Sequence, residues 1–217
     1  MTRVKICGLR DPHSLDMAVR EGVHAVGFVF YEPSPRHISV GEARNLCLDI
    51  PPFVSRVGVF VDRSVEEILE IAHTAGLDAI QLHGEQYHED HVRKLRGEWY
   101  GKVIKAVRVV SLDDDVIERY HKTEAHAILF DAWHPEEYGG TGQRVSVSIH
   151  TMQVWFSQRG ILAGGIRKEN LEEVLRFQPY AIDVSSGVEK EKGVKDPNLI
   201  REFLRYFYEK VSGLSNV

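Results

Sequence analysis

The sequence contains only two cysteines, Cys7 and Cys47, among its 217 residues. Two thiols without framework spacing exclude a disulfide-rich secreted scaffold and favour a reducing compartment. No apolar run is long enough to span a bilayer, and the first residues contain no apolar stretch of signal-peptide length. We therefore expect a cytoplasmic protein that does not act at a membrane.

An excess of positive charge is also absent. The chain carries 27 Lys and Arg against 32 Asp and Glu, which gives a formal net charge of −5, and the two signs are interspersed. This balance argues against a nucleic-acid partner recognised through bulk charge, but it allows a local basic pocket for an anionic small molecule. We expect the partner to be a small-molecule substrate.

Histidines with metal-ligand spacing are missing too. His83, His88 and His91 lie close together in the sequence, but their spacing matches no zinc-protease pattern. A solvated helix face explains His88 and His91, so we expect no metal. Only His83 comes at the end of a predicted strand, where it is a candidate for substrate contact.

What the sequence does contain is a regular alternation of short apolar runs and amphipathic stretches. Helical patterns cover, for example, 12–21, 64–75, 168–176 and 196–209, and Ser64 followed by Glu67 predicts a capping box. Between such patterns lie eight runs, rich in β-branched or aromatic residues, that predict strands: 3–7, 24–30, 56–61, 78–82, 102–107, 126–131, 160–163 and 180–184.

Eight strand–helix units of about 27 residues each are typical of a (β/α)₈ barrel near its lower size limit. No Pro/Gly/Ser-rich linker divides residues 1–217. We therefore predict a single α/β domain with the TIM-barrel fold. The alternative, an open doubly wound sheet, usually has fewer strands and a topological switch point.

Polar side chains come at the carboxyl ends of three predicted strands. Period-two alternation places Lys5 and Cys7 on one face of the first strand, while Asp131 and Asp183 end the sixth and eighth. Charged residues inside a barrel are costly unless they serve a site. Cys7 alone could equally be a small buried hydrophobe, and Cys47 is most simply a core thiol. The convergence of Cys7, Asp131 and Asp183 favours an active site at this end.

Two loops rich in glycine and serine follow the last two predicted strands: Gly164 and Gly165, then Ser185, Ser186 and Gly187. Such loops let backbone N–H groups approach an anion, and in this fold they often bind phosphate. Ordinary turn formation is the alternative. Two such loops in adjacent units favour phosphate binding.

Two further loops have less specific signals. Arg36, in the 34–37 segment after the second strand, is a candidate for binding a carboxylate, because a guanidinium can hold one through two hydrogen bonds. The glycine-rich stretch at 138–142 is either a lid over a substrate or a surface loop.

Together these features resemble the phosphoribosylanthranilate isomerase family, whose members carry out an Amadori rearrangement in tryptophan biosynthesis. The resemblance covers nearly the whole chain, with its motifs in order from the first strand to the last. The segments are KICGLR at 5–10, GFVFYEPSPRHIS at 27–39, VGVFVD at 57–62, QLHGEQ at 81–86, LFDAWHPEEYGGTGQ at 129–143, LAGGI at 162–166 and DVSSGVEKEKGVKD at 183–196.

The resemblance implies a barrel that works without cofactor or metal. It implies that Cys7 is the general base, that Asp131 is the general acid and that Arg36 holds the anthranilate carboxylate. The loops with Gly164–Gly165 and Ser185–Gly187 would bind the phosphate, and Asp183 would face the ribose hydroxyls. In such a site we expect Lys5 to lower the pKa of the Cys7 thiol.

Three other interpretations remain open. A barrel isomerase acting on the aminoaldose of histidine synthesis is one, but related sites commonly use two aspartates where this chain has Cys7. A non-catalytic barrel that binds a phosphate ligand is another, although both acid and base are present. Redox sensing by Cys7 lacks a resolving cysteine nearby in sequence. The chain departs from the family's pattern at 144–147, which leaves the lid's contacts open, and the sequence allows a monomer or a homodimer.

Overall fold

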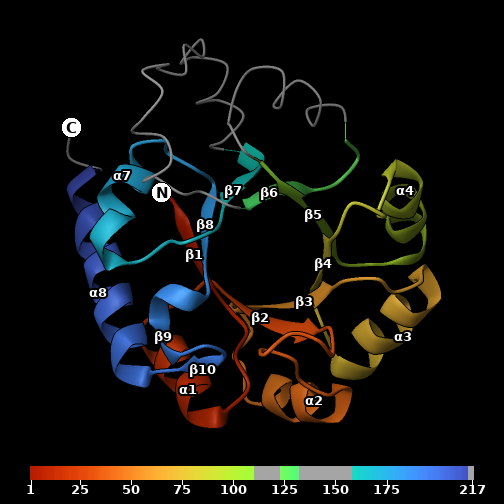
Figure 1. Cartoon of the computed structure of the whole chain (residues 1–217), viewed down its shortest axis with the longest axis horizontal. Coiled ribbons are helices and arrows are strands. Elements are labelled where there is room, and N and C mark those ends of the chain that lie inside the picture. The colour runs from red at the N-terminus through yellow and green to blue at the C-terminus, as the bar shows by residue number, and fades with distance from the viewer. Residues whose placement is uncertain (110–122, 132–157, 215–217) are drawn as a thin grey trace.

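Eight parallel strands close into a barrel at the centre of the molecule (Figure 1). The computed structural model describes residues 1–109, 123–131 and 158–214. Each strand pairs with the next in sequence, and β8 returns to β1. The strands are β1 Arg3–Cys7, β2 Ala25–Phe30, β3 Ser55–Phe60, β4 Ala79–His83, β5 Lys102–Arg108, β6 Ala127–Asp131, β7 Gly160–Leu162 and β8 Ala181–Val184. This closed order confirms the predicted (β/α)₈ barrel and excludes the open doubly wound sheet.

Helices surround the barrel (Figure 1). The described ones are α1 Pro12–Arg20, α2 Val40–Leu48, α3 Val65–Ala75, α4 Glu89–Glu98, α7 Leu171–Leu175 and α8 Pro197–Leu214, with 3₁₀ turns η1 Lys168–Asn170 and η2 Ser186–Val188. Each predicted strand range agrees with the observed one to within a residue at either end. None of the helices in this part of the chain is long and apolar enough to cross a membrane.

Local sequence signals explain where the helices begin. The Ser64 side chain accepts a hydrogen bond from the Glu67 backbone and Glu67 reaches back to Ser64, so the predicted capping box is present at α3. Asp196 Oδ1 accepts from the Asn198 backbone N–H at 2.8 Å at the start of α8. Such caps satisfy N–H groups that have no partner within the helix.

The alternation along the strands divides the apolar residues into two cores. Outward-facing side chains pack against the helices in a large core that also contains the Cys47 thiol, as predicted. The barrel interior is filled mainly by small or branched side chains: Val57, Ala79, Ile104, Ala106, Ala127, Leu129, Ile161, Ala163 and Ala181. Lys5, Gln81 and Asp183 are buried as well. Polar groups at such positions need partners or a function.

A short antiparallel hairpin, β9 Glu189–Glu191 and β10 Val194–Lys195, lies between β8 and α8. The alternation of strands and helices does not predict it. Gly193 forms part of its turn, and a Cβ at that position would overlap the carbonyl oxygen of Pro35. The hairpin therefore packs tightly against the loop that follows β2 and carries Arg36.

Candidate functional site

A cavity of about 1020 Å³ opens at the carboxyl ends of the strands. All the predicted site residues except Gly187 line it: Cys7, Arg36, His83, Asp131, Gly164, Gly165, Asp183, Ser185 and Ser186. Ends of parallel strands converge at one rim of a barrel, which is where enzymes of this fold place their catalytic groups. The fold thus gathers into one cavity residues that are far apart in sequence.

Cys7 ends β1 inside the rim, and its side chain is almost fully buried beside Val29 and Val59. Burial raises the pKa of the thiol; Lys5 and Lys195 oppose this shift, while the carboxylate of Asp183 adds to it. The expected lowering of this pKa by Lys5 is therefore outweighed. Cys7 is therefore a thiol at neutral pH, because burial penalises the thiolate more than the cations stabilise it.

Lys5 lies on the same interior face as Cys7 and forms an ion pair with Asp183. The Nζ of Lys5 donates to Oδ1 of Asp183 at 2.8 Å, and both side chains are buried. Burial works against the ammonium, but Asp183 and Cys7 hold the pKa of Lys5 above its ordinary value. Lys5 is therefore a fixed positive charge beneath the thiol.

Asp131 ends β6 on the same cavity, and its neighbour there is His83. The Nε2 of His83 lies 3.3 Å from Oδ2 of Asp131. Burial lowers the pKa of His83. The Asp131 carboxylate partly offsets this shift, and the Arg108 cation adds to it. The imidazole is therefore neutral at pH 7 and can act as a hydrogen-bond partner of the Asp131 carboxyl without adding charge.

Arg36 is held by a carboxylate from the hairpin rather than standing alone. Its Nε and Nη2 donate to the two carboxylate oxygens of Glu189 at 2.7 and 2.8 Å. The Nζ of Lys195 donates to the same carboxylate at 2.6 Å. Although burial opposes ionisation, these hydrogen bonds lower the pKa of Glu189 to about 2. The predicted carboxylate-binding arginine thus belongs to an ionic cluster of three side chains.

The loops after β7 and β8 pack against each other. Gly164 and Gly165 adopt positive φ values of 90° and 61°, which glycine accommodates without strain. A Cβ at Gly187 would overlap the carbonyl oxygen of Ile166, so the absence of a side chain there lets the two loops meet. The 3₁₀ turn η1 follows the first of these loops, and the 3₁₀ turn η2 begins within the second loop at Ser186. What they offer an anion is therefore backbone N–H groups and hydroxyls rather than the dipole of a long helix.

Sequence reasoning missed Gln81, Glu189 and Lys195. Gln81 lines the cavity two residues before His83 on β4, and its buried Oε1 has no hydrogen-bond partner within the described residues. Strand alternation could have identified it, because it shares a face with His83. Glu189 and Lys195 belong to a segment of alternating charge that looks like a solvated loop, and no local signal marks them as buried.

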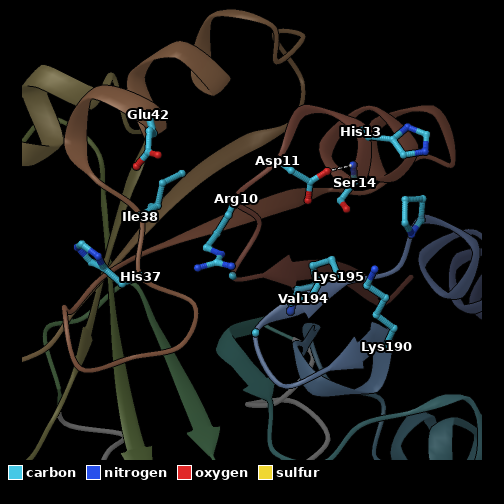
Figure 2. Close-up of a pocket in the computed structure, with 13 residues that line it drawn as sticks. Arg10, Asp11, His13, Ser14, His37, Ile38, Glu42, Lys190, Val194 and Lys195 are labelled. Carbon is cyan, nitrogen blue, oxygen red and sulfur yellow. Dashed lines mark hydrogen bonds between the residues drawn. The ribbon is translucent and has the colours of Figure 1, made fainter.

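A second, smaller cavity of about 590 Å³ lies between the loops that follow β1 and β2 and the β9–β10 hairpin (Figure 2). Arg10 and Lys190 line it together with Asp11 and Glu42. These two positive and two negative side chains balance, so they favour neither an anionic nor a cationic ligand. Lys195 also lines it but is bonded to Glu189. The predicted lid at 138–142 and the segment at 144–147 lie outside the described residues.

Comparison with known proteins identifies close relatives. Residues 4–206 match the family model described as N-(5′-phosphoribosyl)anthranilate (PRA) isomerase. A protein of that name from Trichlorobacter lovleyi is 41% identical over 207 residues, which cover 94% of this chain and 97% of the relative. Another from Thermotoga neapolitana is 41% identical over 206 residues, which cover 94% and 98%.

Solved structures agree with these matches. A phosphoribosyl anthranilate isomerase in complex with reduced 1-(o-carboxyphenylamino)-1-deoxyribulose 5-phosphate has a TM-score of 0.78 and 35% identity, and the match covers 96% of this chain and 100% of that one. The isomerase from Thermotoga maritima has a TM-score of 0.78 and 38% identity, covering 98% and 100%. A thiamine phosphate pyrophosphorylase from Pyrococcus furiosus, with a TM-score of 0.64 and 15% identity, shares the fold alone.

Proposed function

The chain belongs to the N-(5′-phosphoribosyl)anthranilate isomerase family, and on that premise we propose which of its residues bind the substrate and move the protons. It converts N-(5′-phosphoribosyl)anthranilate into 1-(o-carboxyphenylamino)-1-deoxyribulose 5-phosphate, an Amadori rearrangement in tryptophan biosynthesis. This reaction needs one acid and one base. The observation that carries the assignment is that Cys7 and Asp131 line a single cavity at the carboxyl ends of β1 and β6.

The substrate has an anionic group at each end. The phosphate is assigned to the loops after β7 and β8, where Gly164 and Gly165 leave the backbone open and Ser186 lines the cavity. The carboxylate is assigned to Arg36, which lies against Gly8, the residue after the base: a Cβ at Gly8 would be 2.8 Å from Cδ of Arg36. The anthranilate nitrogen is attached at C1, next to the carbon where Cys7 acts, so its carboxylate comes within reach of Arg36.

In the first step Asp131, in its protonated form, gives a proton to the furanose ring oxygen. The bond between C1 and that oxygen breaks, and the nitrogen lone pair forms an iminium with C1. His83 holds the Asp131 carboxyl from one side through its neutral ring. Asp183 and Oε1 of Gln81, which has no hydrogen-bond partner in the described part of the chain, are assigned to the ribose hydroxyls, because both are buried polar groups on the cavity wall.

In the second step Cys7, as a thiolate, removes the proton from C2. The electron pair of that C–H bond forms the C1–C2 double bond and neutralises the iminium, which gives an enolamine. Gain of a proton at C1 and loss of the C2 hydroxyl proton then produce the ketone. Lys5 supports the step because its positive charge is the strongest of the influences that oppose the raised pKa of the thiol.

The domain organisation, location and oligomeric state belong to the same proposal. We take residues 1–217 as one barrel domain that works in the cytoplasm on a small-molecule substrate. The relative from Thermotoga maritima is dimeric and has also been obtained as monomers, so we keep both a monomer and a homodimer as possible assemblies of this chain.

The decisive experiment follows the fluorescence of phosphoribosylanthranilate as purified protein consumes it. Wild-type protein and the core variant Cys47→Ser are expected to consume it at similar rates. Cys7→Ser and Asp131→Asn are each expected to lose at least about 100-fold in kcat, the usual contribution of one positioned acid or base. Near-normal turnover by either variant contradicts the assigned mechanism.

A further inference from the structure

Arg36 is the only part of its ionic cluster that reaches the main cavity; Glu189 and Lys195 lie behind it. The exposed fractions of the three side chains fall from 23% for Arg36 to 4% for Glu189 and 1% for Lys195. The Gly193 backbone N–H donates to the second oxygen of Glu189 at 3.1 Å. Glu189 is therefore bonded to both cations and to the hairpin turn, which fixes its carboxylate plane and, through two hydrogen bonds, the plane of the guanidinium.

The charges of Arg36, Glu189 and Lys195 do not cancel: the cluster lacks one negative charge, which a ligand can supply. A guanidinium paired with one carboxylate is a neutral unit, and a neutral unit attracts a second carboxylate weakly. Lys195 restores a net charge of +1, because two cations share the single carboxylate of Glu189. In a buried setting this charge is weakly screened, so it acts on a ligand at the surface of the cluster.

The same lysine links the cluster to the catalytic strand. Lys195 Nζ donates to the carbonyl oxygen of Ser185 at 3.0 Å and lies 3.3 Å from its Oγ. The Ser185 hydroxyl in turn donates to the carbonyl oxygen of Cys7 at 3.2 Å. A continuous chain of hydrogen bonds therefore runs from Arg36 to the backbone of the general base, and the β9–β10 hairpin supplies its central members.

Resting on the role proposed above for Arg36, we propose that Glu189 and Lys195 are positioning residues that make Arg36 a receptor for a single carboxylate. Glu189 aims the guanidinium, and Lys195 supplies the net positive charge that the anthranilate carboxylate completes. Neither residue touches the substrate. They determine specificity for a substrate with an acidic ring, while the phosphate loops bind the other end whether or not the ring carries a carboxylate.

The test compares two ligands: reduced 1-(o-carboxyphenylamino)-1-deoxyribulose 5-phosphate and its phenylamino counterpart without the carboxylate. Lys195→Gln keeps hydrogen-bonding capacity towards Ser185 but removes the charge. Glu189→Asp keeps the charge but is one methylene too short to reach both cations. Each is expected to weaken binding of the carboxylate ligand by about tenfold, the effect of losing about 1.4 kcal/mol, and to leave the Kd of the phenylamino ligand unchanged.

Lys192→Gln is the matched control, because it removes the same charge from an exposed position between the two hairpin strands and is expected to change neither Kd. In turnover, Lys195→Gln is expected to raise KM while kcat changes little. Because only folded protein binds the phenylamino ligand, a variant that binds neither ligand is recognised as unfolded. The other variant then decides the test.

Two results overturn the proposal, and they differ. Wild-type protein that binds both ligands equally contradicts the role of Arg36 itself. Wild-type protein that prefers the carboxylate ligand, with variants that still bind the phenylamino ligand but keep the same preference or weaken both ligands by the same factor, contradicts only the positioning role of Glu189 and Lys195.

Discussion

The Nζ of Lys5 and Oδ1 of Asp183 meet at 2.8 Å across the seam where β8 pairs with β1, and the two residues are direct partners in the strand register. Their side chains are 5% and 8% exposed. Lys5 stands two residues before Cys7 on the same face of β1. The pair therefore links the two strands whose pairing closes the barrel, and its two charges also act on the pKa of Cys7.

Loss of Lys5 is expected to cost stability. Lys5→Met leaves Asp183 buried without its partner, and breaking a buried ion pair from one side costs about 3–5 kcal/mol. Urea unfolding measures this change. The double variant Lys5→Met/Asp183→Asn is expected to be more stable than the single variants imply, because it leaves no uncompensated charge. Additive losses contradict the pairing.

The raised pKa of Cys7 predicts that its thiolate forms only in the alkaline range. Because a thiol whose pKa is above its ordinary value stays protonated at neutral pH, the thiolate fraction rises about tenfold per pH unit below that pKa. In a Cys47→Ala background we expect the ultraviolet absorbance of the thiolate to keep rising beyond about pH 8.5, the ordinary thiol value. A plateau at lower pH indicates a lowered pKa. Lys5→Met is expected to move the rise to still higher pH.

Alkylation by iodoacetamide checks the same pKa without turnover. In a Cys47→Ala background only Cys7 can react, and its rate is expected to rise with pH in step with the thiolate absorbance. In a Cys7→Ser background the remaining thiol is expected to react more slowly, because Cys47 lies in the core under the helices whereas Cys7 lines the cavity, and burial raises the pKa of Cys47 to about 11. A fast reaction of Cys7 at pH 7 contradicts the electrostatics described above.

Replacement of Asp131 is expected to lower kcat more than replacement of His83. Asp131→Asn removes the transferable proton and is expected to lower kcat by about 100-fold to 10,000-fold. His83→Gln removes only the neutral ring 3.3 Å from Asp131, and misplacement of the acid is expected to cost about 10-fold to 100-fold in kcat. A larger loss in His83→Gln than in Asp131→Asn would assign the proton to His83.

Gly187 tests the packing of the phosphate loops. In Gly187→Ala the new Cβ overlaps the Ile166 carbonyl oxygen and lies 3.0 Å from Cα of Arg167, and backbone atoms cannot move aside cheaply. We expect about 1–3 kcal/mol of destabilisation, with weaker competition by inorganic phosphate. Gly97→Ala is the control: nothing lies within 4 Å of its Cβ position in α4, so it is expected to stabilise by about 0.5–1 kcal/mol. Unchanged inhibition by phosphate in Gly187→Ala contradicts the loop assignment.

Periodicity was enough to predict the barrel and the rim residues. Short apolar runs bounded by turn residues locate the strands to within a residue, because strand length and alternation are local properties. The same alternation places Lys5 and Cys7 on the interior face, and strand ends place Asp131 and Asp183 at one rim. The KICGLR segment and the motifs that follow it identify the family.

Pairings between distant residues could not be predicted in this way. The Arg36–Glu189 pair joins the loop after β2 to strand β9, and the two residues are 153 positions apart. Nothing local distinguishes Glu189 from the exposed Glu191 on the same strand. The balance of effects on Cys7 was missed for a related reason. Lys5 is visible in the sequence, but the depth of burial that outweighs it is a property of the assembled site.

The contact between β1 and β8 also bears on when the enzyme can first work. Lys5 and Asp183 are separated by 178 positions, as are Cys7 and its partner Ser185. At about 5–20 residues per second, a ribosome needs roughly 10–35 s to add those positions. During that interval the first strand, with its lysine and thiol, has no partner for its open edge. Nascent chains therefore cannot close the sheet until the final barrel strand has emerged, and premature termination before that strand leaves β1 without its β8 partner and Cys7 without Ser185.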